Sequence, residues 1–448
     1  MTYLARRFDL YIQPRTWWLL SLLWALFVLA YPFPVLLAVA KTGLLLLCIA
    51  AAIDLLFLII PSNPLLVERE CSPKWSLGDD NTVKLMLHNN VSLPWNCMIL
   101  DELPIELQER KFLLSLSLAP LKKDEICYTV KPLKRGIYAY GQVRVIISSP
   151  MLGVFGRRIS AGQPHVVSVY PSFVQLRKYS LYTLQNIARF HGFKKIRRIG
   201  MSYEFEQIKE YVQGDDIRHI NWKATGKTKS LKTNHFTEEK AQPVYVVIDK
   251  SRPMNMAFGG MTLLDYAVNA GAVVANIALQ KGDKAGLLTF SDRVGAALRA
   301  DSSPGQMGRI MDALHAEKYR RTEADFEFVY NAMKRVSSGR SLMFLFTNFE
   351  TLIAMQRVLP VLRKLNRQHL LVVIFFSNDE VENYAYEPAE SLQEIYNRMV
   401  ARQMVGDKRQ MAVELANHGI QSVVCKPEEL TINTLNKYLE LKAKGMIG

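Results

Sequence analysis

The sequence predicts a membrane-anchored protein made of a two-helix membrane hairpin, a small antiparallel β sandwich and a doubly wound α/β domain. Three observations support this prediction. Residues 16–60 are almost continuously apolar, short segments of alternating polarity follow, and the last part of the chain alternates apolar strands with helical patterns. We place the hairpin at 1–61, the sandwich at 62–175, a basic connector at 176–242 and the α/β domain at 243–448.

Two apolar runs make up the membrane hairpin. No charged residue occurs from Thr16 to Ala40, Pro32 and Pro34 follow the first run, and a second run reaches Ile60. Because about 20 apolar residues span a bilayer, the runs predict two short helices joined by a proline-containing turn. Aromatic residues typical of the membrane interface lie at both ends of the first run: Trp17, Trp18 and Tyr31.

Positive charge sets the expected orientation of the hairpin. Arg6, Arg7 and Arg15 precede the first helix, which places the N-terminus in the cytoplasm. A hairpin returns the chain to the same side, so the sequence predicts a multi-pass inner-membrane protein with cytoplasmic soluble domains. Asp54 lies in the second run, where an acid is either a functional residue or a structural one close to the helix end.

Composition narrows the class of protein. The five cysteines are scattered without a CxxC pair or a Cys/His cluster, which argues against a disulfide framework and a zinc site and fits a reducing compartment. The net charge is +15. Since no nucleic-acid-binding motif occurs, we assign this charge to membrane lipid or an acidic partner and expect no nucleic acid.

Residues 65–175 contain the segments that predict the β sandwich. They have period-2 polarity and are separated by turn signals, as small antiparallel sandwiches are. The clearest segments are Thr82–His88, Ile126–Val130 and Gln142–Ile147. This part carries no catalytic constellation, so we interpret it as a structural or protein-contact module.

The connector combines basic runs with a conspicuous polar motif. The main basic run consists of Lys194, Lys195, Arg197 and Arg198. We expect this run and the lysines within 227–232 to face lipid headgroups or an acidic partner. The motif Gly214-Asp215-Asp216 predicts a turn into a short helix with Asp215 or Asp216 as the N-cap. In the following stretch we expect Trp222 to pack inward, Arg218 to pair with a nearby acid, and 227–236 to form an exposed strand.

The last domain alternates strands with helices. Its apolar strands lack alternation, as is typical of parallel strands covered on both faces. Strands are predicted at Val244–Ile248, Ala285–Phe290, Ser341–Phe346, Leu370–Phe376 and Gln421–Cys425. Helices are predicted at Leu263–Gln280, Gly305–His315, Phe326–Val336, Leu352–Asn366 and Leu392–His418.

The end of the first strand of this domain resembles the von Willebrand factor A family. That family binds Mg²⁺ through Asp-x-Ser-x-Ser, a later Thr and an Asp. Asp249 and Ser251 match the motif, and Thr322 corresponds to the Thr. Pro253 replaces the second Ser and Asn348 stands at the Asp position. The resemblance therefore implies either a Mg²⁺ site at Asp249, Ser251 and Thr322, or a retained fold whose metal site has decayed.

The whole chain resembles the bacterial family that carries domain of unknown function 58. The resemblance rests on a long motif that runs from Glu204 to Thr225. It implies a partnership with a MoxR-type AAA+ ATPase and other von Willebrand A proteins. The binding residues that we expect on this motif are Tyr211, Gly214, Asp215, Asp216, Arg218 and Trp222.

These observations lead to one expected function and its rivals. We expect a non-enzymatic, membrane-anchored adaptor that binds a protein partner through its α/β domain and works with the ATPase in envelope-related assembly or stress response. One alternative is a metal-assisted hydrolase at the degenerate site, although no nucleophile or general base accompanies the metal residues. The other is a basic module that binds nucleic acid or lipid.

Overall fold

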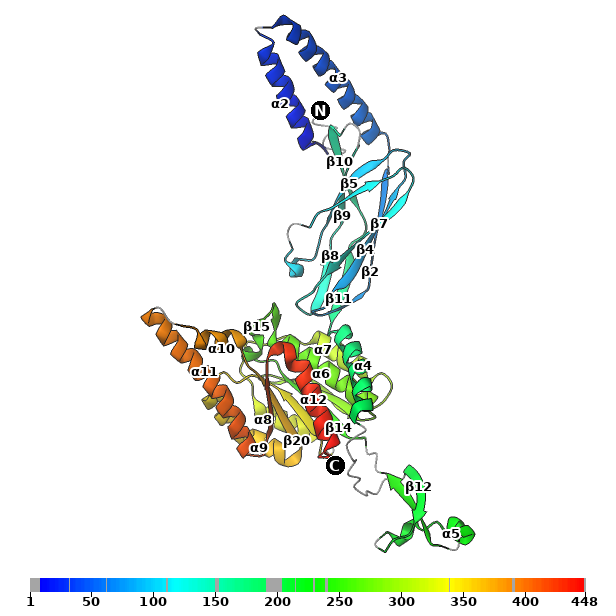
Figure 1. The fold of residues 1–448 in the computed structure, drawn as a ribbon, viewed down its shortest axis with the longest axis vertical. Coiled ribbons are helices and arrows are strands. Elements are labelled where there is room, and N and C mark those ends of the chain that lie inside the picture. The colour runs from blue at the N-terminus through cyan, green and yellow to red at the C-terminus, as the bar shows by residue number, and fades with distance from the viewer. Residues whose placement is uncertain are drawn as a thin grey trace. The chain divides into compact units, whose positions relative to one another are not determined.

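The computed structural model describes residues 9–31, 33–61, 63–109, 112–149, 153–190, 204–213, 215–228, 230–237, 241–337, 339–388 and 391–446. The chain divides into two compact units, Met1–Tyr170 and Pro171–Gly448. The first unit contains the N-terminal helices and a β domain. The second contains the α/β domain and the residues of the family motif (Figure 1).

Two apolar helices open the first unit and lie side by side: α2 (Pro14–Leu29) and α3 (Pro34–Ile59) (Figure 1). Each begins with a proline, whose missing N–H costs nothing in the first helical turn. Within α3, Val35–Ile59 is 25 residues long with a mean hydropathy of 2.6, enough to cross a bilayer. The only other span of this kind in the described residues, Leu263–Gln280, is mostly buried in the second unit.

The base of the helix pair is bonded to the β domain. Asp54 is fully buried, and its Oδ2 accepts hydrogen bonds of 2.8 Å from the backbone N–H groups of Val154 and Phe155. Arg157 donates at 2.8 Å to the carbonyls of Leu58 and Pro61, which lie at and just beyond the end of α3. Asp54 therefore has a structural role, and its partners are backbone groups.

Within the described residues, the β domain contains eleven strands, which form three sheets. The sheet orders are β1-β10-β9-β5-β6, β3-β11-β8 and β2-β4-β7, and every pair is antiparallel except β3 with β11. The three predicted segments lie in β4, β7 and β9. The strand bounds are β1 Leu10–Ile12, β2 Leu65–Cys71, β3 Lys74–Ser76, β4 Asn81–Asn89, β5 Trp95–Asp101, β6 Leu114–Leu118, β7 Lys123–Val130, β8 Gly136–Tyr140, β9 Val143–Ser148, β10 Phe155–Ala161 and β11 His165–Tyr170, with a 3-10 turn, η1, at Ile105–Leu107.

A buried ion pair lies inside this otherwise apolar domain. The Arg69 and Asp101 side chains are 2% and 0% exposed and form a salt bridge. Tyr128 donates to the same carboxylate at 2.5 Å, and the Arg69 guanidinium lies 4.4 Å from the centroid of the Tyr140 ring. A buried charge is tolerated only when it is paired and hydrogen-bonded, and here each group supplies the other's partner.

A six-stranded sheet forms the centre of the second unit, in the order β18-β17-β14-β19-β20-β21. All five predicted strands and all five predicted helices of this domain are present. One difference is β18, which was not predicted and runs antiparallel at the edge, so the sheet is mixed. The strand bounds are β14 Pro243–Asp249, β17 Lys284–Phe290, β18 Val294–Asp301, β19 Leu342–Phe346, β20 Leu370–Phe376 and β21 Gln421–Cys425, with a short pair at β15 Ala257–Phe258 and β16 Met261–Thr262.

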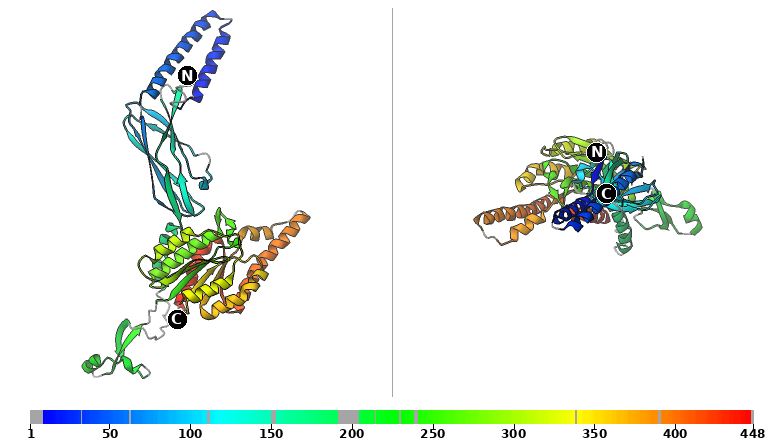
Figure 2. Two further views of the ribbon diagram at one scale, coloured as in Figure 1. Left: turned by 180° about the vertical axis from the view of Figure 1, so that it is seen from behind. Right: turned by 90° about the horizontal axis from the view of Figure 1, so that it is seen from above.

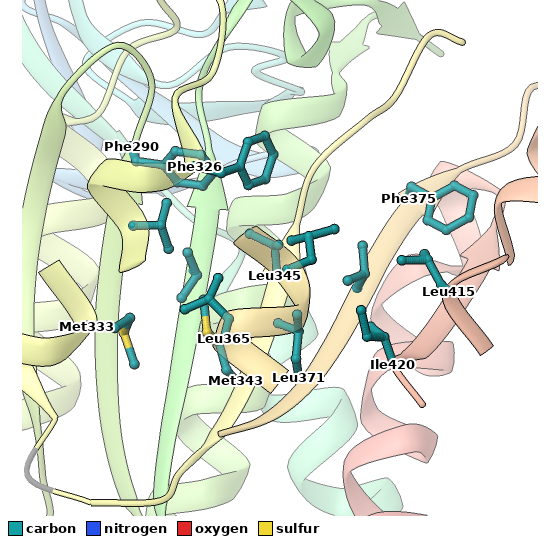
Figure 3. Close-up of a cluster of buried hydrophobic side chains, with 14 of the residues drawn as sticks. Phe290, Phe326, Met333, Met343, Leu345, Leu365, Leu371, Phe375, Leu415 and Ile420 are labelled. Atoms are coloured by element: carbon teal, nitrogen blue, oxygen red, sulfur yellow. The ribbon is translucent and has the colours of Figure 1, made fainter. Parts of the chain in front are cut away.

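Helices cover both faces of this sheet (Figure 2). Helices α4, α7 and α12 pack on α6 along one face, and α8, α9 and α11 pack together on the other. Alternate strand residues meet the second group in an apolar cluster that includes Phe326, Leu365 and Leu415 (Figure 3). The helix bounds are α4 Phe173–Phe190, α6 Leu263–Gln280, α7 Gln306–Ala316, α8 Phe326–Val336, α9 Leu352–Gln368, α10 Asp379–Tyr386, α11 Leu392–Asn417 and α12 Leu430–Ala443, with 3-10 turns η3 Arg252–Asn255 and η4 Pro427–Glu429.

The family motif folds as a β-hairpin, which we call the signature hairpin (residues 204–237). It contains β12 (Glu204–Glu210), η2 (Ile217–His219), α5 (Trp222–Thr228) and β13 (Lys232–Thr237). Two expectations are wrong here. Trp222 is 70% exposed, because it starts a short helix without a neighbouring core. The strand expected over 227–236 begins only at Lys232, and Lys227 and Thr228 belong to α5.

We predict that Asp101→Ala destabilises the β domain by about 3–5 kcal/mol, because it leaves the Arg69 charge buried without a partner. Chemical unfolding of the full chain in detergent micelles measures the change. The control is Glu102→Ala, which removes a partly exposed carboxylate paired with Arg144 and should cost about 1 kcal/mol or less. Equal effects of the two substitutions would contradict a structural role for the buried pair.

We also predict that Asp54→Leu speeds amide hydrogen exchange at Val154 and Phe155, because both N–H groups lose their acceptor while α3 stays apolar. Mass-spectrometric hydrogen exchange on the micellar protein measures this effect. Asp54→Asn keeps one carbonyl oxygen and should give an intermediate rate. Unchanged exchange in the leucine variant would show that the hydrogen bonds do not hold this joint.

Candidate functional site

The strand order places a ligand-binding edge between β14 and β19. From β14 the chain first builds outward through β17 and β18, and then returns to add β19, β20 and β21 on the other side. In open α/β sheets, ligands bind beyond the carboxyl ends of the strands at such a reversal of strand order. The residues that follow β14 and β19 are therefore the candidate site.

Asp249 closes the end of β14 and links it to β19. It is 1% exposed. Its Oδ1 accepts a 2.8 Å hydrogen bond from the Ser251 backbone N–H, and its Oδ2 accepts one of 2.8 Å from the Thr347 hydroxyl. Burial raises the pKa of the Asp249 carboxyl, while the bonds from Ser251 and Thr347 work in the opposite direction. The Ser251 hydroxyl is also fully buried, and it makes no hydrogen bond of ordinary geometry with a described residue.

A lysine from α11 occupies the position next to Thr347. Lys408 Nζ donates at 2.7 Å to Asn348 Oδ1 and at 2.6 Å to the carbonyl of Phe349. Its ammonium lies 5.6 Å from the centroid of the Phe375 ring. Burial lowers the pKa of Lys408 to about 8. The loop after β19 is thus held by two contacts. Asp249 bonds to Thr347, and Lys408 of α11 bonds to Asn348 and Phe349.

A second buried ion pair lies on the other side of Asp249. Lys250 Nζ is 2.5 Å from Glu317 Oε2, and Glu317 Oε1 accepts from the Thr289 hydroxyl at 2.5 Å and from the Ala296 N–H at 2.9 Å. Burial would raise the pKa of Glu317, but these hydrogen bonds outweigh it and the pKa is lowered. The carboxylate therefore stays ionised and holds the β17–β18 edge against the end of β14.

Thr322 lies beside the same loop but bonds to a different acid. Its carbonyl accepts from the Arg252 N–H at 2.9 Å, which places the 317–322 segment along the loop after β14. Its hydroxyl donates to Asp292 Oδ1 at 3.1 Å, and Arg320 Nε lies 3.2 Å from the same oxygen. The structure thus brings the segments of Asp249, Ser251 and Thr322 together, but the Thr322 hydroxyl is bonded to Asp292.

The donor set does not fit a resident Mg²⁺ ion. Mg²⁺ needs six oxygens in near-octahedral array. Both Asp249 oxygens already accept hydrogen bonds, Pro253 has no side-chain oxygen, and the Asn348 oxygen is taken by an ammonium group. Among the described residues, no group of three or more His, Cys, Asp or Glu side chains could hold a metal.

The exposed part of this edge is charged. Arg252 and Glu350 follow β14 and β19, their side chains are 57% and 43% exposed, and Arg252 Nη2 lies 3.2 Å from Glu350 Oε2. Beneath this pair hydrogen bonds join Asp249 to Thr347 and Lys408 to Asn348, while the buried Ser251 hydroxyl has no partner of ordinary geometry among the described residues. The edge therefore has an exposed, charged rim above a buried, hydrogen-bonded layer.

The predicted binding residues of the signature hairpin divide into two groups. Tyr211, Asp215 and Asp216 build the turn: the Tyr211 N–H donates to Leu231 O, Lys209 Nζ bonds Asp215 at 2.9 Å, and Asp216 caps η2 through the Arg218 N–H at 3.0 Å. The N-cap expectation is confirmed for Asp216. Arg218 and Trp222 are exposed, and Arg218 forms no ion pair with a described residue. Gly214 and the basic run at 194–198 lie outside the described residues.

Sequence reasoning missed the two side chains that close the site. Thr347 directly follows a predicted strand, so its position at the sheet edge was a usable signal. Lys408 lies sixty residues beyond Asn348 within a long helix, and no local pattern marks it. Its role depends on how α11 packs, which is a tertiary property.

We predict that Lys408 makes the stability of the protein depend on pH. Its pKa is about 8 in the folded chain and about 10.4 in an unfolded one, so the unfolded state binds more protons between these values. Stability relative to Lys408→Met should rise with pH from about 8 to about 10, by about 3 kcal/mol at most. Thermal unfolding at several pH values measures this difference. Lys364→Met, which removes an exposed ammonium from α9, is the control, and a wild-type-minus-K408M difference that is flat with pH would contradict the buried ammonium.

Comparison with solved structures finds only partial similarity. The PKD domain of an M14-like peptidase from Thermoplasmatales archaeon SCGC AB-540-F20 is 12% identical with a TM-score of 0.18, over 25% of this chain and 100% of that one. A CARDB domain from Pyrococcus furiosus is 11% identical with a TM-score of 0.17, over 24% and 94%. Proximal thread matrix protein 1 from the mussel byssus is 14% identical with a TM-score of 0.26, over 45% of each chain. At these scores the likenesses support no conclusion about function, and no curated protein matches the chain.

One family matches the sequence itself. Residues 207–382 match the family described as "Protein of unknown function DUF58". The match begins in β12, takes in the signature hairpin and the first five strands of the six-stranded sheet, and ends within α10. The resemblance inferred from the motif is thereby confirmed over this stretch: residues 207–382 of the chain belong to the DUF58 family.

Proposed function

We propose that the protein is a membrane-anchored, non-enzymatic adaptor whose α/β domain binds a protein partner at the carboxyl edge of β14 and β19. The observation that carries this proposal is the contrast between the two layers of that edge. The inner layer, around Asp249 and Thr347, is closed by its own hydrogen bonds, whereas Arg252 and Glu350 on the rim are exposed. A charged rim over a closed interior suits a macromolecular surface better than a small substrate.

Membrane anchoring is proposed from the two N-terminal helices. Both expose large apolar and aromatic side chains along their length, Trp18 and Trp24 among them. In water such surfaces would aggregate, and in a bilayer they are satisfied. With Arg15 at the start of α2 and the soluble units after α3, we infer a hairpin in the inner membrane with the remainder in the cytoplasm.

The α/β domain supplies the binding role. A doubly wound sheet with Asp249 and Ser251 after its first strand supports a von Willebrand A-like domain, and the DUF58 match supports the family context. Catalysis would need a nucleophile or general base poised beside an open position. Here Asp249 is bonded to Ser251 and Thr347, and Lys408 to Asn348 and Phe349, so both titratable groups are already engaged.

The partner that we propose is a MoxR-type AAA+ ATPase, and the process is envelope-related assembly or stress response. Both follow from the family resemblance. An ATPase supplies the energy that a chain without its own nucleotide motif lacks. The adaptor would hold that machine, or its substrate, at the membrane surface.

We predict that Arg252→Glu weakens binding of a MoxR-type ATPase from the same cell by about tenfold or more, because it breaks the pair with Glu350 and leaves two carboxylates side by side on the proposed binding rim. Biolayer interferometry with the full chain in nanodiscs, with Mg²⁺ and ATP present, measures the affinity.

Arg309→Glu is the matched control, since Arg309 forms a similarly exposed pair with Asp301 at 3.2 Å on the β18–α7 side of the sheet. Binding should be unchanged in this variant. Loss of binding in both variants would indicate a general charge effect. The proposed function would be contradicted if the wild-type chain captured no MoxR-type ATPase in any nucleotide state.

A further inference from the structure

Helix α11 presents an apolar face that the rest of the described chain leaves uncovered. Leu392, Ile395, Tyr396 and Met399 lie at i, i+3, i+4 and i+7, so they share one face, and they are 86%, 51%, 64% and 65% exposed. We call these four residues the α11 face. The second half of α11 packs on β21 and α9 through Met411 and Leu415, so the helix is anchored while its first half carries the exposed face (Figure 1).

Two arginines of the same helix segment contact α10, and one of them, Arg398, is buried. Arg398 is 8% exposed, its guanidinium lies 5.4 Å from the Tyr384 ring of α10, and Arg402 Nε donates at 2.8 Å to the Ala385 carbonyl. A helix that only covered its own domain would bury its apolar side. Here four large apolar side chains stay exposed on one face while Arg398 is buried, which favours an external contact for the α11 face.

Acidic side chains lie on α10, the helix that packs against α11. Helix α10 and the residues after it carry Asp379, Glu380, Glu382 and Glu387. Asp379 pairs with Lys426 and Glu382 with Arg409, while Glu380 and Glu387 are exposed and form no ion pair with a described residue. Carboxylates beside an apolar face disfavour an anionic lipid surface. They favour a protein segment that carries apolar anchors and free positive charge.

The signature hairpin has that chemistry. Val212, Ile217 and Trp222 are each at least 63% exposed. Arg218, Lys223 and Lys227 are exposed between and beside them and form no ion pair with a described residue. Trp, Tyr, Met and Arg are the residues enriched at protein interfaces, and here they lie on two exposed surfaces of one chain, one basic and one next to the carboxylates of α10.

We propose that the α11 face takes the signature hairpin of a second copy of this chain, with Trp222 as the apolar anchor and Arg218, Lys223 and Lys227 opposite the carboxylates of α10. The two surfaces differ, so the contact is head-to-tail, and each copy offers one donor and one acceptor surface. Successive copies can then join into a ring or an array on the membrane. This assembly needs no ATPase, so it stands apart from the adaptor proposal.

The experiment uses the full chain in detergent micelles and two variants that each disable one surface. Trp222→Ala with Lys223→Glu disables the hairpin, and Leu392→Asp with Met399→Asp disables the α11 face. All four residues are exposed, so the fold should be retained. Light scattering coupled to size exclusion, over a range of protein concentrations, measures the mass. Ile353→Asp, at an exposed apolar position on α9, is the matched control.

The wild type and Ile353→Asp should self-associate, and each disabled variant alone should do so about tenfold more weakly or not at all. A mixture of the two variants keeps one intact contact, between the hairpin of one and the α11 face of the other. It should therefore form a dimer and nothing larger.

Three results would overturn the proposal. A monomeric wild type at every concentration would mean that the surfaces do not join two copies. A hairpin variant that associates as well as the wild type would mean that α11 faces pair with each other or that another surface is used. Two variants that fail to form a dimer when mixed would exclude the head-to-tail contact.

Discussion

The buried carboxylate of Asp54 is the interaction on which the N-terminal unit of the protein depends. It accepts hydrogen bonds from two backbone N–H groups at the start of β10. In the opposite direction, Arg157 of β10 donates hydrogen bonds to the carbonyls of Leu58 and Pro61. β1, which precedes the helices, pairs with the same strand β10. The apolar helices and the β domain therefore form one structural unit.

Charged side chains also join distant segments of the chain at the carboxyl edge of the six-stranded sheet. Asp249 and Lys250 are buried and Lys408 is partly buried. Each is bonded across segments distant in sequence: to Thr347, to Glu317 and to the Asn348 loop. Charges are costly inside a protein unless they are paired, so these contacts fix the loops that form the edge. The ammonium of Lys408 bonds to the Asn348 oxygen and ties the loop after β19 to α11.

The sequence predicted the parts of the fold that depend on local pattern. The apolar runs from Thr16 to Ile60 and the unbroken apolar strands have strong signals, and β20, β21, α6 and α8 begin and end where the pattern predicts. The antiparallel β18 was missed because its alternating polarity ends in exposed residues and no turn motif marks its direction. Trp222 was expected inside because large aromatics usually are, but a short hairpin has no core to receive it. Lys408 and the α11 face could not be found locally: the first depends on tertiary packing, and an i, i+3, i+4, i+7 apolar pattern is equally typical of a buried helix.

The central claim is that α2 and α3 lie in the inner membrane and that the folded units lie on its cytoplasmic side. Two native cysteines test it directly, because Cys127 is exposed on the β domain and Cys48 is exposed on α3. In chains that keep only one of them, a membrane-impermeant maleimide should label Cys127 in inside-out vesicles but not in intact spheroplasts. It should label Cys48 in neither preparation. Labelling of Cys127 from outside intact spheroplasts, or ready labelling of Cys48 in membranes, would contradict the account.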